Sequence, residues 1–174
     1  MNNHRLSPII TPPQSWSYPE KHFVEALSNP WYKGVFVLTS SVFDSTVNFF
    51  RSESFYPTLA PITTGAISSP SGIGSDSLPV KILLFDKETY LADSMQFHLE
   101  YLLRHGTKGI YYIMPTFRGE DPDNRHLNQF FHSEAELIGN LEDVMRLIER
   151  YLCSCVSDIL EHHSNLVGNV AGTT

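Results

Sequence analysis

The side chains best suited to chemistry cluster in one stretch near the middle of this 174-residue chain, which reads PTFRGEDPDNRHLNQFFHSEAE. An arginine leaves an apolar run, a carboxylate follows two residues later, and a charged loop leads to a second arginine, a histidine and an aromatic ring. These residues are Arg118, Glu120, Arg125, His126 and Phe130. Arg118 could stabilise the charge that develops on an α-phosphate as the leaving group departs, and Phe130 could stack on a base. The stretch therefore predicts a site for a nucleoside triphosphate.

Simpler interpretations of these residues stay open at this point. Arg118 and Glu120, taken alone, would form an ordinary surface ion pair, and such pairs are common and weak. His126 could be a structural histidine. Alternate residues of a strand face opposite sides, so only one of Phe130 and Phe131 can offer a stacking surface while the other packs in the core.

Two further carboxylates, Glu134 and Glu136, follow on the same expected strand. Their spacing of two residues puts both on one face of the strand. They could bind an ammonium group there, or they could simply face solvent.

Hydrophobic spacing predicts the elements that position these residues. We expect residues 110–117 and 128–138 to form a long antiparallel hairpin around the charged loop. A final helix begins after Asn140, which is a good N-terminal cap. The other expected elements are helices over residues 31–51 and 90–105, the second ending at Gly106, an edge strand over 55–62, a strand over 80–85 and a turn at 86–88.

The segment 65–77 is rich in Gly and Ser and includes most of the run SSPSGIGSDSLP. We expect a flexible linker, although glycines that cradle a phosphate would have a similar composition. Long loops in a compact domain are usually functional or disordered.

The central stretch resembles motif 2 of the class II aminoacyl-tRNA synthetases, in the subgroup for aspartate, asparagine and lysine. That motif runs F-R-x-E, a variable loop, R-H-L and then an aromatic residue. The matching positions are Phe117, Arg118, Glu120, Arg125, His126, Leu127 and Phe130. This ordered match favours a site over a surface ion pair.

Upstream segments extend the resemblance. The run YLADSMQ, which ends at Gln96, is similar to the family's substrate-pocket segment, in which the last glutamine helps to hold the amino acid. Residues 49–62 resemble a degraded motif 1, with Pro61 in the place of its signature proline. In total the resemblance covers roughly residues 35–150.

The resemblance implies a role for each motif 2 residue in binding ATP. Arg118 would contact the substrate carboxylate and the α-phosphate, and it would be the catalytic residue. Glu120 would lie near the adenine or the substrate amine. Arg125 and His126 would approach the β- and γ-phosphates, and Phe130 would stack on the adenine.

The resemblance also implies an amino-acid end of the site. Gln96 would face the amino group, and Glu134 or Glu136 would reach toward the amino acid. Aspartyl enzymes carry a lysine three residues after the pocket glutamine, where this chain has Leu99. Asparaginyl enzymes have an uncharged residue there, and their motif 2 strand tends to end in a Glu-Ala-Glu run like that at residues 134–136. Asparagine or a related uncharged amide therefore fits better than aspartate.

The sequence also departs from the family pattern. The third motif, a glycine-rich turn followed by an arginine that lies against ATP, should come well after residue 150 and is not found. The downstream carboxylates that hold catalytic magnesium and an anticodon-binding domain are not found either. Asp93 and Met95 replace more usual residues in the pocket segment. We therefore expect ATP and Mg²⁺ as cofactors with no metal ligands identifiable in this chain, and complete aminoacylation only with help from a second polypeptide.

The leading functional interpretation is ATP-dependent activation of asparagine or a related amino acid as the adenylate. One alternative is a non-catalytic, truncated paralogue that acts by dimerising with a full-length partner. Another is an amide ligase that uses the same adenylate without tRNA. The missing third motif favours the non-catalytic alternative. Retained contact with ATP is favoured by four intact residues, Arg118, Glu120, Arg125 and His126.

The fold implied by the resemblance is α/β, or more narrowly α+β: an antiparallel sheet flanked by helices, as in an incomplete class II core. We expect an extended arm over residues 1–30, a partial catalytic core over 31–162 and a flexible tail over 163–174. The edge near Pro61 and the helix before it correspond to the family's dimer surface, so a homodimer is expected.

Composition limits the classes of partner. A net charge of −7 and a pI near 5.5 argue against a broad basic surface for nucleic acid, so any contact with tRNA would be local. No apolar run approaches the roughly 18 residues of a membrane span, and the first residues lack a leader pattern. We therefore expect a cytoplasmic protein that does not enter a membrane.

The cysteines and histidines do not predict a metal site. Cys153 and Cys155 lie two residues apart in an expected helix and point to different sides, so they cannot easily form a disulfide. His162 and His163 are adjacent, without the i, i+4 spacing that puts two ligands on one helix face. We expect no structural zinc.

Overall fold

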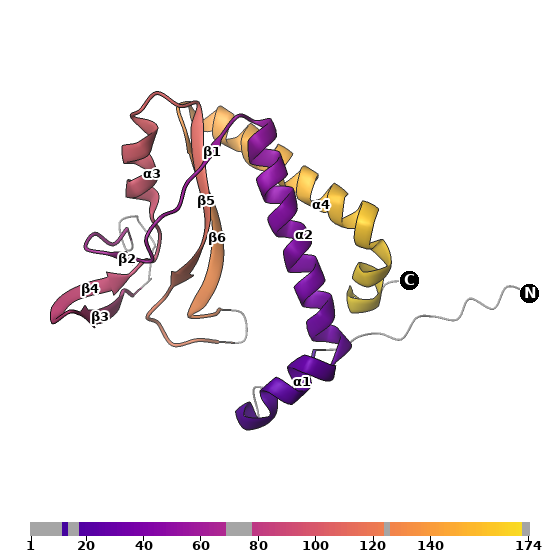
Figure 1. Cartoon of the computed structure of the whole chain (residues 1–174). Coiled ribbons are helices and arrows are strands. Elements are labelled where there is room, and N and C mark those ends of the chain that lie inside the picture. Colours follow the sequence, from indigo (N-terminus) through magenta and orange to yellow (C-terminus); the bar gives the residue numbers. More distant parts are fainter. Residues whose placement is uncertain (1–11, 14–17, 69–77, 124–125, 172–174) are drawn as a thin grey trace, which may run out of the picture. The chain divides into compact units, whose positions relative to one another are not determined.

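The structure is a computed structural model that describes residues 12–13, 18–68, 78–123 and 126–171 (Figure 1). The chain divides into two compact units, one of residues 50–144 and the other of residues 1–49 with 145–174. The elements are η2 (Pro19–Lys21), α1 (His22–Ser28), α2 (Pro30–Ser52), β1 (Tyr56–Pro57), β2 (Thr63–Thr64), β3 (Val80–Leu84), β4 (Lys87–Leu91), α3 (Gln96–Leu103), β5 (Gly109–Phe117), β6 (Gln129–Leu137) and α4 (Leu141–Ala171). This mixture of helices and small sheets confirms the expected α+β class.

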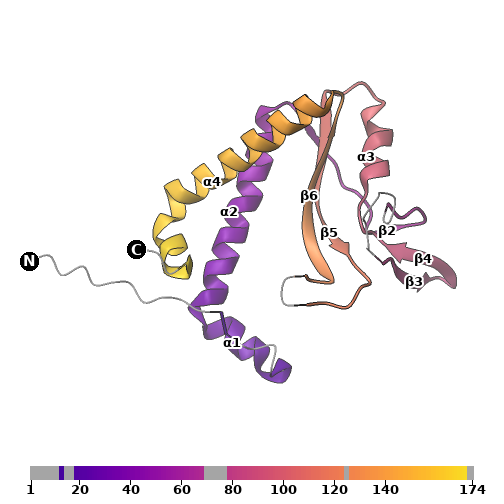
Figure 2. The same ribbon diagram turned by 180° about the vertical axis from the view of Figure 1, so that it is seen from behind.

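Residues 50–144 contain two three-stranded sheets. One has the order β1-β5-β6, with β1 parallel to β5 and β5 antiparallel to β6, and the other is antiparallel with the order β2-β4-β3. The predicted hairpin around the charged loop is confirmed, since β5 and β6 pair along their whole length. Figures 1 and 2 show α3 beside this hairpin in views from opposite sides.

The core of this unit lies between α3 and the β5-β6 hairpin. Its buried side chains are Ala92, Met95, Leu99, Ile110, Tyr112 and Met114. Alternate residues of β5 supply the last three, as the two-residue period of a strand requires. The other face of β5 is covered too, because Tyr111 stacks on Phe50 with ring centroids 4.5 Å apart. The face of β5 toward α3 is therefore buried, and the opposite face is buried at Tyr111 and half-buried at Ile113, Pro115 and Phe117.

The helix predicted over residues 90–105 begins later, at Gln96. Tyr90 belongs to β4 instead and pairs with Lys81 of β3. The Ser94 hydroxyl accepts a hydrogen bond from the Gln96 N–H at 3.0 Å, which satisfies a donor that the first turn leaves without a partner in the helix. α3 ends at Leu103, two residues before the predicted end, and Gly106 turns the chain after it with a φ of +83°.

One predicted strand and one predicted turn are also corrected. Only Tyr56–Pro57 of the expected strand 55–62 pairs with a neighbour, and Pro57 and Pro61 limit further pairing because proline has no N–H to donate. The expected turn at 86–88 is shorter and falls one residue earlier, at Phe85 and Asp86. Both have positive φ, 51° and 62°, as a two-residue hairpin turn of type I′ requires.

In the other unit, α2 confirms the helix predicted over residues 31–51. Its Thr46 hydroxyl bonds to the Tyr151 hydroxyl of α4 at 2.8 Å, and the Phe49 and Tyr151 rings lie 5.4 Å apart. The segment expected to be an extended arm includes η2 and α1. α4 continues through the expected tail to Ala171, with non-helical angles at His163 (φ −135°, ψ 21°).

The start of α4 confirms Asn140 as its cap. The Asp143 N–H donates to Asn140 Oδ1 at 3.1 Å, and the Asn140 N–H donates back to Asp143 Oδ2 at 3.0 Å. This reciprocal pair is a capping box. Among the helices formed by described residues, none combines the length and the hydrophobicity needed to cross a bilayer.

We predict that Leu99→Ala lowers the free energy of unfolding by about 2–5 kcal/mol, because Leu99 has no exposed surface and truncation would leave a cavity between α3 and β5. The measurement is urea unfolding followed by circular dichroism. Tyr101→Ala on the same helix is the control, since Tyr101 is 67% exposed and its loss should cost about 0.5 kcal/mol or less. Equal losses in the two variants would contradict this placement of the core.

Candidate functional site

A cleft of about 410 Å³ opens where the β5-β6 hairpin ends in its charged loop. Its lining residues are Arg118, Glu120, Asp121, Pro122, His126, Leu127, Asn128 and Phe130. All the residues that the sequence assigned to ATP lie in this wall except Arg125, which falls outside the described residues. The hairpin thus brings together side chains that are up to twelve residues apart in sequence, from Arg118 to Phe130.

Arg118 is held by backbone carbonyls. Its Nη1 donates to the Asp93 oxygen at 2.6 Å and to the Phe117 oxygen at 2.9 Å. Its Cζ lies 5.1 Å from the centroid of the Phe130 ring, a cation–π distance. Since carbonyl oxygens carry only partial charge, the guanidinium keeps its full charge for an anion in the cleft.

Arg118 and Glu120 do not form the surface ion pair that the sequence had left open. Glu120 Oε2 instead accepts the Leu78 N–H at 3.0 Å. This hydrogen bond is the main cause that lowers the pKa of Glu120, and the charge of Arg118 adds to it. Glu120 therefore ties the loop after β5 to the residues before β3.

His126 lies exposed at the mouth of the cleft. Its N–H donates to Asp123 Oδ1 at 2.8 Å, and its ring Nδ1 lies 2.9 Å from the same oxygen. Both contacts are local to the loop and fix the ring through Nδ1. Nε2 is then the nitrogen that remains for a ligand.

Asp93 is a buried carboxylate behind the cleft, 1% exposed. Its oxygens accept the Ser68 N–H and hydroxyl, both at 3.2 Å, and the Ser94 N–H at 3.0 Å. Its backbone oxygen is the one that receives Arg118. Asp93 therefore fixes the segment before α3 and the arginine together.

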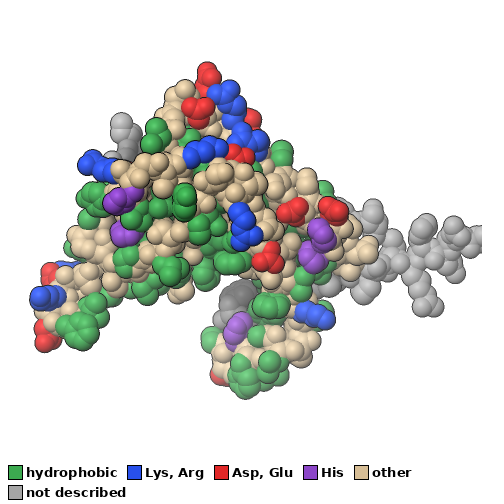
Figure 3. All heavy atoms as spheres, turned by 45° about the horizontal axis from the view of Figure 1, so that its top comes forward, with side chains coloured by type: hydrophobic (Ala, Val, Ile, Leu, Met, Phe, Trp, Pro, Cys, Tyr) green, Lys and Arg blue, Asp and Glu red, His purple; other side chains and the backbone are tan. Residues whose placement is uncertain are grey.

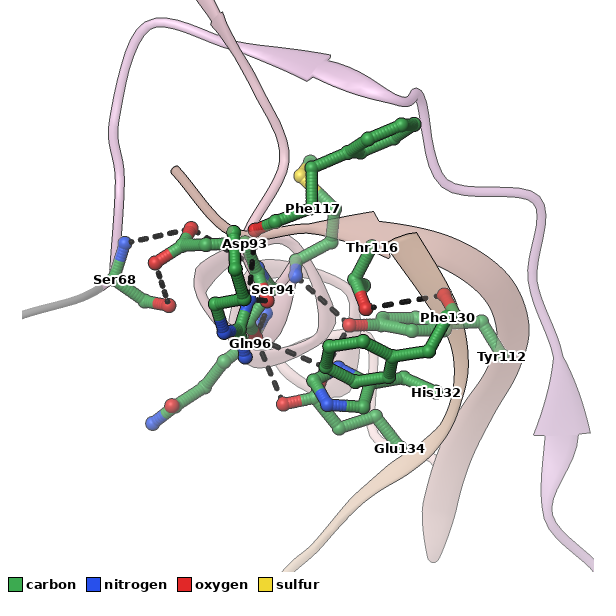
Figure 4. Close-up of polar contacts among 12 residues, drawn as sticks. Ser68, Asp93, Ser94, Gln96, Tyr112, Thr116, Phe117, Phe130, His132 and Glu134 are labelled. Atoms are coloured by element: carbon green, nitrogen blue, oxygen red, sulfur yellow. Dashed lines mark hydrogen bonds and ion pairs between the residues drawn. The ribbon is translucent and has the colours of Figure 1, made fainter. Parts of the chain in front are cut away.

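Glu134 forms a second buried cluster with Ser94 and Tyr112 (Figure 4). The Ser94 hydroxyl lies 2.7 and 2.9 Å from the two carboxylate oxygens, and the Tyr112 hydroxyl donates to Oε2. The Met95 N–H donates to the Tyr112 oxygen at 2.8 Å. Burial raises the pKa of Glu134, Ser94 opposes this, and the charge of Asp93 adds to the rise.

His132 lies between Phe130 and Glu134 on the same face of β6. Its ring meets Phe130 edge-on at 4.9 Å, and its Nδ1 is 3.6 Å from Glu134 Oε2. That distance is too long for a hydrogen bond, and the Nδ1 atom is buried. Burial lowers the pKa of His132 and the charge of Arg118 lowers it further, so the neutral ring is favoured.

The other two residues assigned to the amino acid lie farther from this cluster. Glu136 is half-buried on the same face of β6, and burial together with the charge of Glu100 raises its pKa. The Gln96 side chain donates to Glu100 at 3.1 Å and points away from Glu134 in Figure 4. The structure therefore joins Glu134 to the Arg118 region through Asp93 and Ser94, and not through the Gln96 side chain.

We expected one of Phe130 and Phe131 to offer a stacking surface and the other to pack in the core, and the structure differs from this. Phe130 is half-buried against Arg118, but Phe131 is 69% exposed and does not pack in the core. On the face of β6 that carries Phe131, Ser133 is exposed as well, whereas Ala135 and Leu137 are half-buried. No group of three or more His, Cys, Asp or Glu side chains among the described residues is placed to hold a metal ion.

The sequence did not indicate four residues that contribute to the site, which are Ser68, Asp93, Ser94 and Tyr112. The only signal was Asp93, which had been noted as a departure from the family pattern. A charged residue inside an otherwise buried segment is a hint, because such groups are rarely buried without partners. The pairing of Tyr112 with Glu134 follows from the strand register, which the sequence does not specify.

A family model described as class II tRNA synthetases (D, K and N) matches residues 17–172. An aspartate-tRNA(Asp) ligase of Pyrococcus horikoshii is 31% identical over 140 residues, 79% of this chain and 31% of that protein. An asparagine-tRNA ligase of Thermoplasma acidophilum is 28% identical over 137 residues, 77% of this chain and 30% of that protein. The chain thus spans about a third of the length of these relatives.

Solved structures show the same fold. Asparaginyl-tRNA synthetase of Pyrococcus horikoshii, complexed with asparaginyl-adenylate, matches with a TM-score of 0.72 at 23% identity, over 80% of this chain and 31% of that one. The Entamoeba histolytica asparaginyl-tRNA synthetase matches with a TM-score of 0.72 at 19% identity, over 96% of this chain and 35% of that one.

We predict that the stability difference between wild type and Glu134→Gln depends on pH. The raised pKa means that the native state takes up this proton more readily than the unfolded chain. The stability contributed by Glu134 is therefore complete below the unfolded pKa of about 4.3, and it is lost as pH rises through the folded value. Wild type should lose free energy of unfolding relative to the variant from about pH 4 upward, as measured by urea unfolding.

For His132→Gln we expect the opposite pH dependence of the difference in free energy of unfolding from wild type. The pKa of His132 is lowered, so its contribution is present above the unfolded value of about 6.5 and is lost as pH falls through the folded value. A gap between wild type and Glu134→Gln that stayed constant with pH would contradict the burial of this carboxylate.

Proposed function

The chain belongs to the class II tRNA synthetases, in the family of the D, K and N enzymes, and on this premise we propose that residues 50–144 form the ATP- and amino-acid-binding part of an asparagine-activating site. The observation that carries the proposal is the cleft whose wall contains Arg118, Glu120, His126 and Phe130. A cation, an imidazole and an aromatic face in one concave wall suit a nucleotide.

Activation needs a carboxylate oxygen of the amino acid to attack the α-phosphorus of ATP. A new bond forms between that oxygen and the α-phosphorus. The bond between the α-phosphorus and the oxygen that bridges to the β-phosphate breaks, and pyrophosphate leaves with the electron pair of the broken bond. In the proposal, Arg118 binds the attacking carboxylate and an α-phosphate oxygen, and it stabilises the charge that grows between them. Its two carbonyl contacts support this role, because they orient the guanidinium before the substrate arrives.

The nucleotide would extend along the cleft wall. Phe130 would stack on adenine through ring surface that the Arg118 guanidinium leaves open. In its imidazolium form His126 would donate from Nε2 to the β- or γ-phosphate while Nδ1–H donates to Asp123, with Arg125 as a second cation in the role that the sequence assigned to it. Glu120 would lie near the adenine amine, although its bond to Leu78 already uses one of its oxygens.

The amino-acid end would use Glu134 and Glu136 for the ammonium group, with Gln96 beside them. Gln96 would have to leave its contact with Glu100 to do so. Leu99 is fully buried in the core, so this position offers no cation to a substrate side-chain carboxylate. Carboxylates near the pocket would repel a second negative charge, which favours asparagine over aspartate.

Magnesium does not fit the described residues as a bound ion, because they gather no set of ligands for it. We therefore assign no step of the reaction to a metal held by this chain. Any magnesium would arrive with the ATP phosphates.

The proposal includes a homodimer. Several large hydrophobic side chains of α2 are exposed, and Figure 3 shows exposed hydrophobic side chains in patches on one face. Those of α2 are Val35, Phe36, Val42 and Phe43. Such patches commonly mark association surfaces.

In the proposal, tRNA would accept the activated amino acid. It would bind through local contacts, because the net charge of −7 does not provide a broad basic surface.

We predict that wild type binds ATP with magnesium in isothermal titration and that Arg118→Ala weakens this binding at least about tenfold, because a charge-assisted contact to phosphate is lost. Asparagine should strengthen ATP binding by wild type but not by the variant. Arg104→Ala is the matched control, since it removes an exposed arginine from the end of α3.

The control variant should bind ATP as wild type does. Absence of ATP binding by folded wild type would remove the activating function and favour the non-catalytic alternative. If binding is seen, pyrophosphate exchange is the next assay. Exchange without transfer to tRNA would favour the amide-ligase alternative.

We predict that L-asparagine binds at least about tenfold more tightly than L-aspartate in the presence of ATP, because the pocket carboxylates repel the extra charge. Glu136→Gln should narrow this ratio by removing one like charge, and titration of both amino acids into both proteins would measure it. Tighter binding of aspartate would overturn the asparagine assignment.

A further inference from the structure

Tyr112 has no part in the proposed reaction so far, yet among the described residues it is the largest side chain with less than 2% of its surface exposed. It lies in the middle of β5, directly opposite Glu134 in the register of the hairpin. A phenylalanine would fill the same space without a hydroxyl that needs partners. The hydroxyl therefore calls for an explanation beyond packing.

The contacts of Tyr112 fix the direction of its hydrogen bond. Its oxygen accepts the Met95 N–H at 2.8 Å, just before α3 begins. The hydroxyl hydrogen is then available to Glu134, whose ionised carboxylate can only accept. Ser94 repeats this arrangement, because its oxygen accepts the Gln96 N–H at 3.0 Å and its hydrogen goes to Glu134.

Two backbone N–H groups at the start of α3 thus orient the hydroxyls of Tyr112 and Ser94 so that both donate to the Glu134 carboxylate. Those hydroxyls are neutral, and the nearest basic contact of Glu134 among the described residues is His132 at 3.6 Å. The lowered pKa of His132 keeps that ring neutral. Glu134 is therefore a partly buried carboxylate that is hydrogen-bonded but not neutralised by a described cation.

Buried charges are normally paired, so this arrangement suits a cationic ligand. A carboxylate has about four lone-pair positions, and Tyr112 and Ser94 occupy only part of them. An ammonium group could take the remainder. Resting on the proposed function, we propose that Tyr112 is a positioning residue that holds the Glu134 carboxylate ionised and oriented for the ammonium group of the amino acid.

The test uses Tyr112→Phe, which removes the hydroxyl and keeps the ring. Tyr111→Phe is the matched control, because Tyr111 is equally buried on the opposite face of the same strand and stacks on Phe50. The first readout is the ¹³C NMR titration of the Glu134 carboxyl without ligand. The second is isothermal titration of L-asparagine and, separately, of ATP into each full-length protein.

Loss of a donor to an ionised carboxylate disfavours the ionised form, so Tyr112→Phe should raise the titration midpoint of Glu134. The groups that face Glu134 in this titration are His132 and Glu136 from β6 and Asp93 from the segment before α3, and the charge of Arg118 after β5 acts on His132. They are unchanged in both variants. Tyr111→Phe should leave the midpoint where it is in wild type.

Tyr112→Phe should also weaken asparagine binding about tenfold while leaving ATP binding unchanged, since a hydrogen bond to a charged group is lost at the amino-acid end only. An unmoved Glu134 midpoint would overturn the positioning role. A moved midpoint with unchanged asparagine affinity would overturn it as well, because the carboxylate would be held but not used.

Failure of the proposed function gives a different pattern. Wild type would then bind no asparagine, and asparagine would not lower the Glu134 midpoint, even where Tyr112→Phe raises that midpoint. This outcome overturns the role toward the substrate, and it identifies the activating function as the part that failed.

Discussion

The register between β5 and β6 is the constraint on which the site depends. It sets Tyr112 opposite Glu134 and Thr116 opposite Phe130. Side chains that are directly opposed in an antiparallel pair lie on the same face, so these contacts are a consequence of the pairing. A slip of one residue would turn Phe130, His132 and Glu134 to the other side of the sheet together. Burial of Ile110, Tyr112 and Met114 on one face stabilises the register, because a slip would bring other residues of β6 to this buried face.

Asp93 joins this hairpin to the segment before α3, because its side chain and its backbone oxygen bind different partners. The carboxylate holds Ser68 and Ser94, and the backbone oxygen holds Arg118. The backbone of the preceding residue continues the connection, since the Ala92 oxygen accepts the Phe117 N–H at 2.9 Å. An error in the placement of this short segment would therefore move both the arginine and the hydroxyl that contacts Glu134.

Sequence reasoning found the elements whose signal is local and repeated. Periodicity, or a single residue with a strong backbone preference, specifies the hairpin, α2, the Asn140 cap and the turn at Gly106 that follows α3. The predicted start of α3 was wrong. Tyr90 has the spacing of a helix residue, but it belongs to β4 and pairs with Lys81 of β3. That pairing is a tertiary contact, so no short window of sequence contains it. The same reason hid Tyr112, which contacts a residue on another strand. It also explains why the expectation that one of Phe130 and Phe131 packs in the core was wrong.

The arrangement of charge suits a zwitterion better than it suits either of its ends alone. An amino acid carries a carboxylate and an ammonium group on one carbon, so its site needs a cation and an anion at a fixed, short separation. Here the cation is Arg118, held by the Asp93 oxygen, and the anion is Glu134, held by the Ser94 hydroxyl. Asp93 and Ser94 are consecutive in the chain, so the groups that hold the two charged side chains lie on neighbouring residues. The peptide bond between these residues keeps the two holding groups close together, which is the kind of preorganisation that a small charged substrate requires.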